Sequence, residues 1–205
     1  MTHEEYFEAL LSAMDNEIVV CALGENGDGW WKLTESRSAF YQHGFMGFAS
    51  SFALGLALSL PEERVWVLNS DGGIAMNLGG LLTEAAWQPP NLLHVILNNH
   101  CYQCLRGAEL VNAERTDYAA VAHAMGIANV YAVTSHDDLR DAVHEWQGMN
   151  QHALIVADVE PRGDALQEQF QEPTVLPFEG PEIKYQFGRA IEERTGRQVF
   201  GPSGY

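Results

Sequence analysis

The stretch RVWVLNSDGGIAMNLGGLLTEAAWQPPNLLHVILNN, residues 64–99, decides the fold class. It holds two apolar runs of strand length, Arg64–Asn69 and Leu92–Leu97, and the second is apolar enough to be buried on both faces. Between them, Asn77–Trp87 is predicted to form a helix. Two buried strands joined through a helix are typical of a right-handed crossover in a parallel sheet.

Helices and strands alternate on both sides of this unit. Further helices are expected at residues 3–14, 46–60, 116–125 and 136–149, and further strands at 17–21, 129–132 and 153–159. Loops are expected at 24–31, which is rich in glycine, in the polar connection that runs to about residue 41, and at 98–115. This alternation predicts an α/β fold: a doubly wound, mostly parallel sheet flanked by helices.

The pattern changes after Glu160. Prolines at 173, 177 and 181 interrupt the segment, and a charged helix at about 182–195 precedes the tail FGPSGY. We therefore divide the chain into one domain at residues 1–160 and a C-terminal arm at 161–205, which is a candidate for contacts with a partner.

Composition narrows the class of protein. A chain of 205 residues with 46% hydrophobic residues is long enough for one domain with a sizeable core. Its net charge of −17 argues against nucleic acid or an anionic membrane as a partner. The N-terminus does not resemble a signal peptide, and the longest apolar stretch, Phe45–Leu60, is too short and interrupted to span a bilayer. Three cysteines fit a reducing cytoplasm, so a cytoplasmic location is expected.

Polar residues follow both strands of the central unit and predict a metal site. Ser70-Asp71-Gly72-Gly73 ends the first strand, and Asn98-Asn99 ends the second, with Asn99 28 positions after Asp71. The carboxyl ends of parallel strands form the ligand edge of such a sheet, so the two turns should lie together. The Asp71 carboxylate and the Asn99 amide oxygen are ligands suited to Mg²⁺ or Ca²⁺.

The same turn is suited to a diphosphate. Gly72 and Gly73 allow the backbone to approach closely, and a helix starting near Asn77 would direct its positive end at the anion. Gly27-Asp28-Gly29 looks similar by its letters. However, the residues 27 and 28 positions after Asp28 are Gly55 and Leu56, not an Asn pair, so we reject it as the metal site.

The chain resembles the diphosphate-binding half of thiamine diphosphate (ThDP)-dependent enzymes, whose motif is Gly-Asp-Gly followed at a similar distance by Asn-Asn. In detail it is similar to the β subunits of sulfopyruvate decarboxylases and to the corresponding part of phosphonopyruvate decarboxylases. The resemblance covers about residues 3–160 and is carried by MGFASSFALGLALSLP (46–61), VWVLNSDGGIAMNLGGLLT (65–83) and NLLHVILNNHCY (91–102).

The resemblance implies roles for individual residues. Asp71 and Asn99 match the metal-ligating side chains, and the carbonyl of Cys101 matches the third protein ligand. Met46 matches the bulky apolar residue that holds the cofactor in a bent conformation. The remaining residues implied to bind the cofactor are Gly44, Ser70, Gly72, Gly73 and Tyr102. Ser70 departs from the family pattern, which has glycine there.

The resemblance also implies a partner. In this class a glutamate that activates the cofactor's aminopyrimidine lies on a separate pyrimidine-binding domain, and this chain has length for only one such domain. Glu25 and Glu84 occupy positions for which the family gives no such role. We therefore expect an α-type partner subunit that supplies the glutamate, in an α2β2 or larger hetero-oligomer.

The expected reaction is decarboxylation of a small anionic 2-oxo acid, with ThDP and Mg²⁺ (or Ca²⁺) as cofactors. His43, His100 and Arg106 flank the motifs, and His43 and His100 are the candidate catalytic residues of this chain. Carboligation, as in acetolactate synthases, and a non-catalytic ThDP-binding or regulatory module remain alternatives. A nicotinamide-binding domain is disfavoured because no Gly-x-Gly-x-x-Gly follows the first strand, and Cys101-x-x-Cys104 lacks a second pair for structural zinc.

Overall fold

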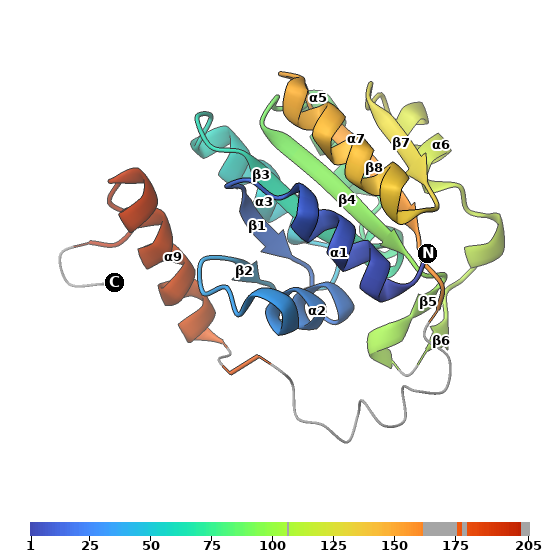
Figure 1. Cartoon of the computed structure of the whole chain (residues 1–205), viewed down its shortest axis with the longest axis horizontal. Helices are drawn as coiled ribbons and strands as arrows, with labels where there is room; N and C mark the ends of the chain where they lie inside the picture. The colour runs from blue at the N-terminus through green and yellow to red at the C-terminus, as the bar shows by residue number, and fades with distance from the viewer. Residues whose placement is uncertain (106, 162–175, 178–179, 202–205) are drawn as a thin grey trace.

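A computed structural model describes residues 1–105, 107–161, 176–177 and 180–201 (Figure 1). Its centre is a sheet of six strands in the order β2-β1-β3-β4-β8-β7, and all neighbouring strands are parallel. The strands are β1 (Ile18–Cys21), β2 (Phe40–Tyr41), β3 (Val65–Ser70), β4 (Leu92–Asn98), β7 (Val130–Val133) and β8 (Ala153–Asp158). The predicted doubly wound, parallel α/β sheet is confirmed, and β3 and β4 lie at its middle.

Helices cover both faces of this sheet. The helices α1 (His3–Ala13), α2 (Glu25–Thr34) and α7 (His136–Gly148) pack on one face, against side chains such as Trp66 and Leu93. The opposite face is covered by α3 (Ala49–Ser59), α4 (Asp71–Met76), α5 (Gly79–Trp87) and α6 (Tyr118–Ala124). Consecutive β4 residues alternate between these two layers, as strand geometry requires.

The glycine-rich segment at 24–31 is not a loop, and that prediction was wrong. Its residues form most of α2, which begins after Gly24, whose φ is +80°. Gly29 makes room for α1, because a Cβ at this position would lie 2.3 Å from the Phe7 ring. The short edge strand β2 was also missed, because two residues give no periodic pattern.

The helix expected from Asn77 is also different in the structure. The Ser70–Gly73 turn is the start of a separate short helix, α4, and α5 follows only from Gly79. The loop at 98–115 contains a small antiparallel pair, β5 (Cys101–Tyr102) with β6 (Ala108–Glu109), and the 3₁₀ turns Gln103–Leu105 and Ala113–Arg115.

The C-terminal helix α9 (Pro181–Thr195) corresponds to the charged helix expected at about 182–195. Its Phe187 and Ile191 pack in the same hydrophobic cluster as α3, and the Phe187 ring meets Phe40 of β2 edge-on. The proposed division of the chain at residue 160 stays a prediction. Of the helices within the described ranges, none has the length and apolarity that crossing a membrane requires.

Candidate functional site

The two motifs meet at the carboxyl edge of the sheet. In the register of the central pair, Ser70 of β3 lies opposite Leu97 of β4. Asp71 directly follows Ser70, and Asn99 lies two positions after Leu97; they are 0% and 2% exposed. The sequence prediction that these two turns lie together is therefore supported by the strand pairing itself.

Ser70 caps the helix that begins with Asp71. The Ser70 φ is −129°, an extended conformation open to any residue, and its hydroxyl accepts a hydrogen bond from the Gly73 N–H at 3.2 Å. Serine therefore fits where the family pattern has glycine.

Both glycines of the turn are required by their surroundings. A Cβ on Gly72 would lie 2.7 Å from the Tyr102 ring, and a Cβ on Gly73 would lie 2.5 Å from the Asn69 Oδ1 atom. The turn is thus closed in on two sides by side chains from β5 and from the end of β3.

The Asp71 carboxylate is held by backbone donors. Gly72 N–H donates to its Oδ1 and His100 N–H donates to its Oδ2, both at 2.7 Å. Burial raises the pKa of Asp71 to about 6, and this effect outweighs the two donors. A carboxylate in such a place gains most from a nearby cation, because the cation stabilises its charged form.

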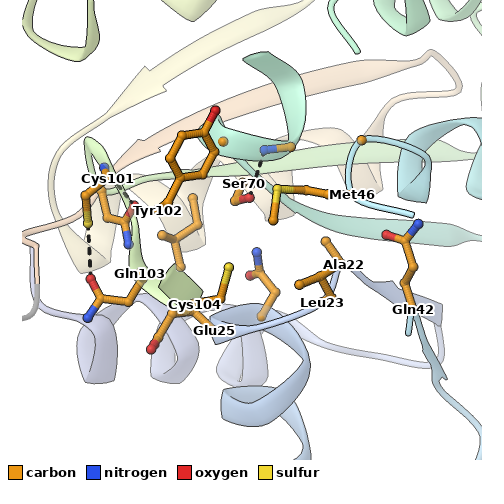
Figure 2. Close-up of a pocket in the computed structure, with 16 residues that line it drawn as sticks. Ala22, Leu23, Glu25, Gln42, Met46, Ser70, Cys101, Tyr102, Gln103 and Cys104 are labelled. Carbon is orange, nitrogen blue, oxygen red and sulfur yellow. Dashed lines mark hydrogen bonds between the residues drawn. The ribbon is translucent and has the colours of Figure 1, made fainter. Parts of the chain in front are cut away.

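A cavity opens beside this turn (Figure 2). Its walls come from the β1–α2 connection, the loop before α3, the β3–α4 turn and the segment after β4. Of the predicted cofactor-binding residues, those that line it are Met46, Ser70, Gly72, Gly73, Asn99, Cys101 and Tyr102. Asp71 is fully buried next to these residues.

Two predicted residues lie elsewhere. Gly44 is exposed with a φ of +73° and is not among the residues that line the cavity. His43 is exposed and lines a second groove, together with Phe45, Phe48 and Phe52. The structure therefore does not bring His43 to the Asp71–Asn99 turn, and Arg106 lies outside the described residues.

His100 lies next to the motif residues. Its Nε2 atom is 2.6 Å from the Asp158 Oδ1 atom at the end of β8. Partial burial lowers the pKa of His100, but the hydrogen bond and charge of Asp158 outweigh it, so the pKa is raised overall. An imidazole paired in this way favours its cationic form, although His100 is not among the residues that line the cavity.

The cysteines near the site are not activated thiols. Burial, together with the negative charge of Asp71, raises the pKa of Cys101 to about 11, and burial also raises the pKa of Cys104. Both thiols are therefore neutral near pH 7, and neither supplies the thiolate, which is the form that reacts and binds metals.

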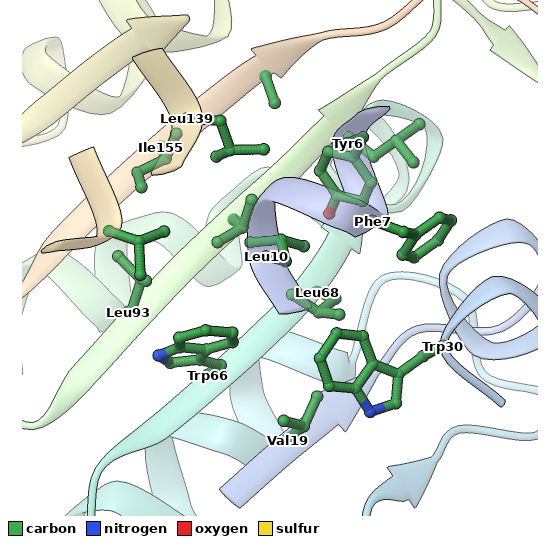
Figure 3. Close-up of a cluster of buried hydrophobic side chains, with 14 of the residues drawn as sticks. Tyr6, Phe7, Leu10, Val19, Trp30, Trp66, Leu68, Leu93, Leu139 and Ile155 are labelled. Atoms are coloured by element: carbon green, nitrogen blue, oxygen red, sulfur yellow. The ribbon is translucent and has the colours of Figure 1, made fainter. Parts of the chain in front are cut away.

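Two buried asparagines were missed by sequence reasoning. Asn26 lines the cavity from α2 and its side-chain amide donates to the Asn69 carbonyl at 2.7 Å. The Tyr6 hydroxyl, at the core of the α1 side of the sheet (Figure 3), donates to the Asn26 Oδ1 atom at 3.2 Å. Asn69 directly precedes Ser70, so its position beside the motif was the one available signal.

The Ser70 cap gives a direct stability test. Changing Ser70 to alanine should lower the free energy of unfolding by about 1 kcal/mol, because the Gly73 N–H loses its partner, whereas S70G should cost only a few tenths. Urea unfolding of both variants measures this difference. Equal stability of S70A and the unmodified chain would show that the hydroxyl does not act as a cap.

Comparison with known proteins identifies the family. The profile described as "Thiamine pyrophosphate enzyme, C-terminal TPP binding domain" matches residues 29–157, which include both motifs. The chain belongs to this family. The predicted resemblance to ThDP-dependent enzymes is thereby confirmed, thiamine pyrophosphate being another name for ThDP.

Several relatives of this TPP-binding domain have described activities. It is 45% identical to the sulfopyruvate decarboxylase subunit beta of Methanothermobacter thermautotrophicus over 122 residues, which cover 60% of this chain and 65% of that subunit. The corresponding subunit of Methanococcus maripaludis is 32% identical over 94% of this chain and 99% of its own length. The phosphonopyruvate decarboxylase of Streptomyces hygroscopicus is 38% identical over 78% of this chain, but over only 39% of its own length.

A solved structure supports the fold. The benzoylformate decarboxylase of Polynucleobacter necessarius superposes with a TM-score of 0.64 and 21% sequence identity. The match covers 78% of this TPP-binding domain chain and 33% of the decarboxylase. The chain thus has the architecture of about one third of that larger enzyme.

Proposed function

We propose that this chain is the diphosphate-binding subunit of a two-subunit, ThDP- and Mg²⁺-dependent 2-oxo acid decarboxylase of the sulfopyruvate or phosphonopyruvate type. The observation that carries the proposal is the meeting of Asp71 and Asn99 at neighbouring strand ends, beside the Gly72–Gly73 turn. The names of the relatives support the decarboxylase class.

The donor set fits the metal and the cofactor. Asp71 and Asn99 would supply oxygen ligands to Mg²⁺ (or Ca²⁺), with the Cys101 carbonyl as the third protein ligand. Gly72 and Gly73 would let the backbone approach the diphosphate where α4 begins. Their N–H groups donate to the Asp71 carboxylate and the Ser70 hydroxyl in the structure, and would exchange these acceptors for the diphosphate on binding. Support comes from the burial of Asp71 and its raised pKa, because a buried carboxylate needs a cation to remain charged.

The rest of the cavity would hold the organic part of the cofactor. Met46 faces the Ser70 turn from the loop before α3 (Figure 2), and it would support the cofactor from the apolar side. When bound, ThDP supplies the electron sink that lets a 2-oxo acid lose CO₂. His100, held by Asp158, would meet an anionic substrate or hold a proton at its ring nitrogen.

A partner subunit would complete the site. We propose that it carries the glutamate that activates the cofactor, in an α2β2 or larger complex in the cytoplasm. Two relatives named as subunit beta support the two-chain arrangement. The groove beside the site adds support, since its Phe45 and Phe48 side chains are 80% and 54% exposed, and exposed aromatic surface is typical of an interface.

The proposal predicts a pH dependence of cofactor binding. The metal requires the Asp71 carboxylate, whereas the metal-free group with a pKa of about 6 is mainly protonated below that pH. Apparent affinity for Mg²⁺ and ThDP should therefore fall as pH decreases through about 6, by up to about tenfold per unit, and binding measured at about pH 5 should release close to one proton from the protein. Calorimetry in buffers of different ionisation enthalpy measures that proton, after subtraction of the ligand's own titration. Binding with no proton release from the protein would contradict the role of Asp71.

The function itself is tested by reconstitution. The chain should be co-expressed with the product of the neighbouring reading frame and assayed for CO₂ release from sulfopyruvate, phosphonopyruvate and pyruvate. Release of CO₂ with an aldehyde as product supports the decarboxylase, and a longer hydroxy-keto product would assign carboligation instead. ThDP binding without turnover of any 2-oxo acid would favour a non-catalytic module.

A further inference from the structure

A chain of buried polar side chains runs from α5 to the metal turn. Glu84 of α5, His94 of β4 and Asn69 of β3 are each no more than 1% exposed. The His94 Nδ1 atom lies 2.9 Å from the Glu84 Oε2 atom, and the His94 Nε2 atom lies 3.2 Å from the Asn69 Nδ2 atom. The Asn69 Oδ1 atom then accepts the Ser70 N–H at 2.9 Å.

The hydrogens in this chain can be assigned from its far end. Ser70 N–H is a donor, so the Asn69 oxygen must face it and the Asn69 amide N–H₂ must face His94. His94 Nε2 is then an acceptor, and its proton is carried on Nδ1, which donates to Glu84. Burial alone would raise the pKa of Glu84, but its contacts with His94 and His152 outweigh burial and lower that pKa, which keeps Glu84 an acceptor.

The Asn69 side-chain amide packs against the Ser70–Gly73 turn. Its oxygen lies so close to Gly73 that a Cβ there would be 2.5 Å away. The main-chain carbonyl of Asn69 accepts a hydrogen bond from the Asn26 side-chain amide at 2.7 Å. The Asn69 side chain therefore holds the Ser70 N–H and fills the space next to Gly73.

We propose that the Glu84–His94–Asn69 chain is a positioning device that sets the Ser70–Gly73 turn for binding of Mg²⁺ and the diphosphate. A buried ionised group of this kind contributes little to stability compared with apolar packing, so its role lies in what it orients. The inference rests on the proposed function, because the turn it orients is the proposed metal and diphosphate site.

His152 provides a matched control within the same cluster. Its Nε2 atom lies 2.9 Å from the Glu84 Oε1 atom, and the residue is 2% exposed. No hydrogen bond within the described residues links His152 to Asn69 or to the turn. Replacing His152 with leucine therefore removes a similar buried bond to Glu84 without interrupting the path to the turn.

The test compares binding of Mg²⁺ and ThDP by calorimetry, using the full chain in complex with its partner subunit. H94L should weaken binding by about tenfold, because Asn69 is free to rotate, and H152L should change it by less than about threefold. H94Q should restore most of the affinity, because one amide can donate to Glu84 and accept from Asn69. Thermal unfolding of each variant should show similar losses for H94L and H152L.

N69A keeps the test decisive if H94L does not fold, because it leaves the Glu84–His94–His152 cluster intact. It should weaken binding by about the same factor as H94L, and the double variant should lose no more than either single change. Equal binding by H94L and the unmodified chain, or equal weakening by H94L and H152L, would overturn the positioning role. Failure of the unmodified complex to bind ThDP would instead overturn the proposed function.

Discussion

Replacing Asp71 with alanine should abolish Mg²⁺-dependent binding of ThDP. Asp71 is the one carboxylate in the Ser70–Gly73 turn and is fully buried. It would supply the negative charge that balances the positive charge of the metal. Without it the site keeps only neutral oxygens, which bind Mg²⁺ poorly. We expect affinity to fall by about three orders of magnitude, or about 4 kcal/mol, in a calorimetric titration of ThDP with Mg²⁺.

Asp28 is the matched control for this change. It belongs to Gly27-Asp28-Gly29, which matches the family motif by its letters, but it lies on α2 and does not line the cavity. D28A should therefore bind ThDP and Mg²⁺ like the unmodified chain. If D28A lost binding while D71A retained it, the metal site would have been assigned to the wrong aspartate.

Purified alone, the chain should release no CO₂ from any 2-oxo acid, even with ThDP and Mg²⁺ present. The proposed site holds metal and diphosphate ligands, whereas the glutamate that activates the cofactor is expected on the partner subunit. Adding that subunit should raise turnover from background to at least about 1 s⁻¹, a usual value for enzymes. A coupled assay for the aldehyde product measures both states.

A set of mixed complexes controls this experiment. The partner subunit with D71A should remain inactive, and the partner with D28A should be active, so that activity is traced to both chains together. Turnover by the isolated chain would contradict the two-subunit proposal. A stable monomer that binds ThDP tightly by itself would also count against it.

The central fold could be predicted because its signals are local. The continuous apolarity of Leu92–Leu97 and the polar turns after both strands depend only on neighbouring residues. The carboxyl ends of parallel strands lie at the same edge of the sheet, so the fold class predicted that Asp71 and Asn99 share that edge. Of the seven predicted residues that line the cavity, Gly72, Gly73 and Asn99 came from this reasoning. The resemblance to ThDP-dependent enzymes supplied the others: Met46, Ser70, Cys101 and Tyr102.

The remaining features depend on contacts distant in sequence. His94 looks like one polar residue in an apolar strand, and its partners Glu84 and Asn69 belong to other elements. The loop that carries His43 and Gly44 follows a path set by positive φ angles at Gly44, Phe45 and Gly47, which no hydrophobic period encodes. His43 is therefore close to Met46 in sequence but lines another groove in space.

The contact between Phe7 and Gly29 has a consequence for the evolution of this domain. The Phe7 ring fills the space that a side chain at position 29 would need, so neither position can change freely while the other stays fixed. Sequences with alanine or a larger residue at position 29 should carry a smaller residue at position 7. The glycine-rich segment would then vary in step with the first helix, while the Asp71 and Asn99 motifs vary independently of both.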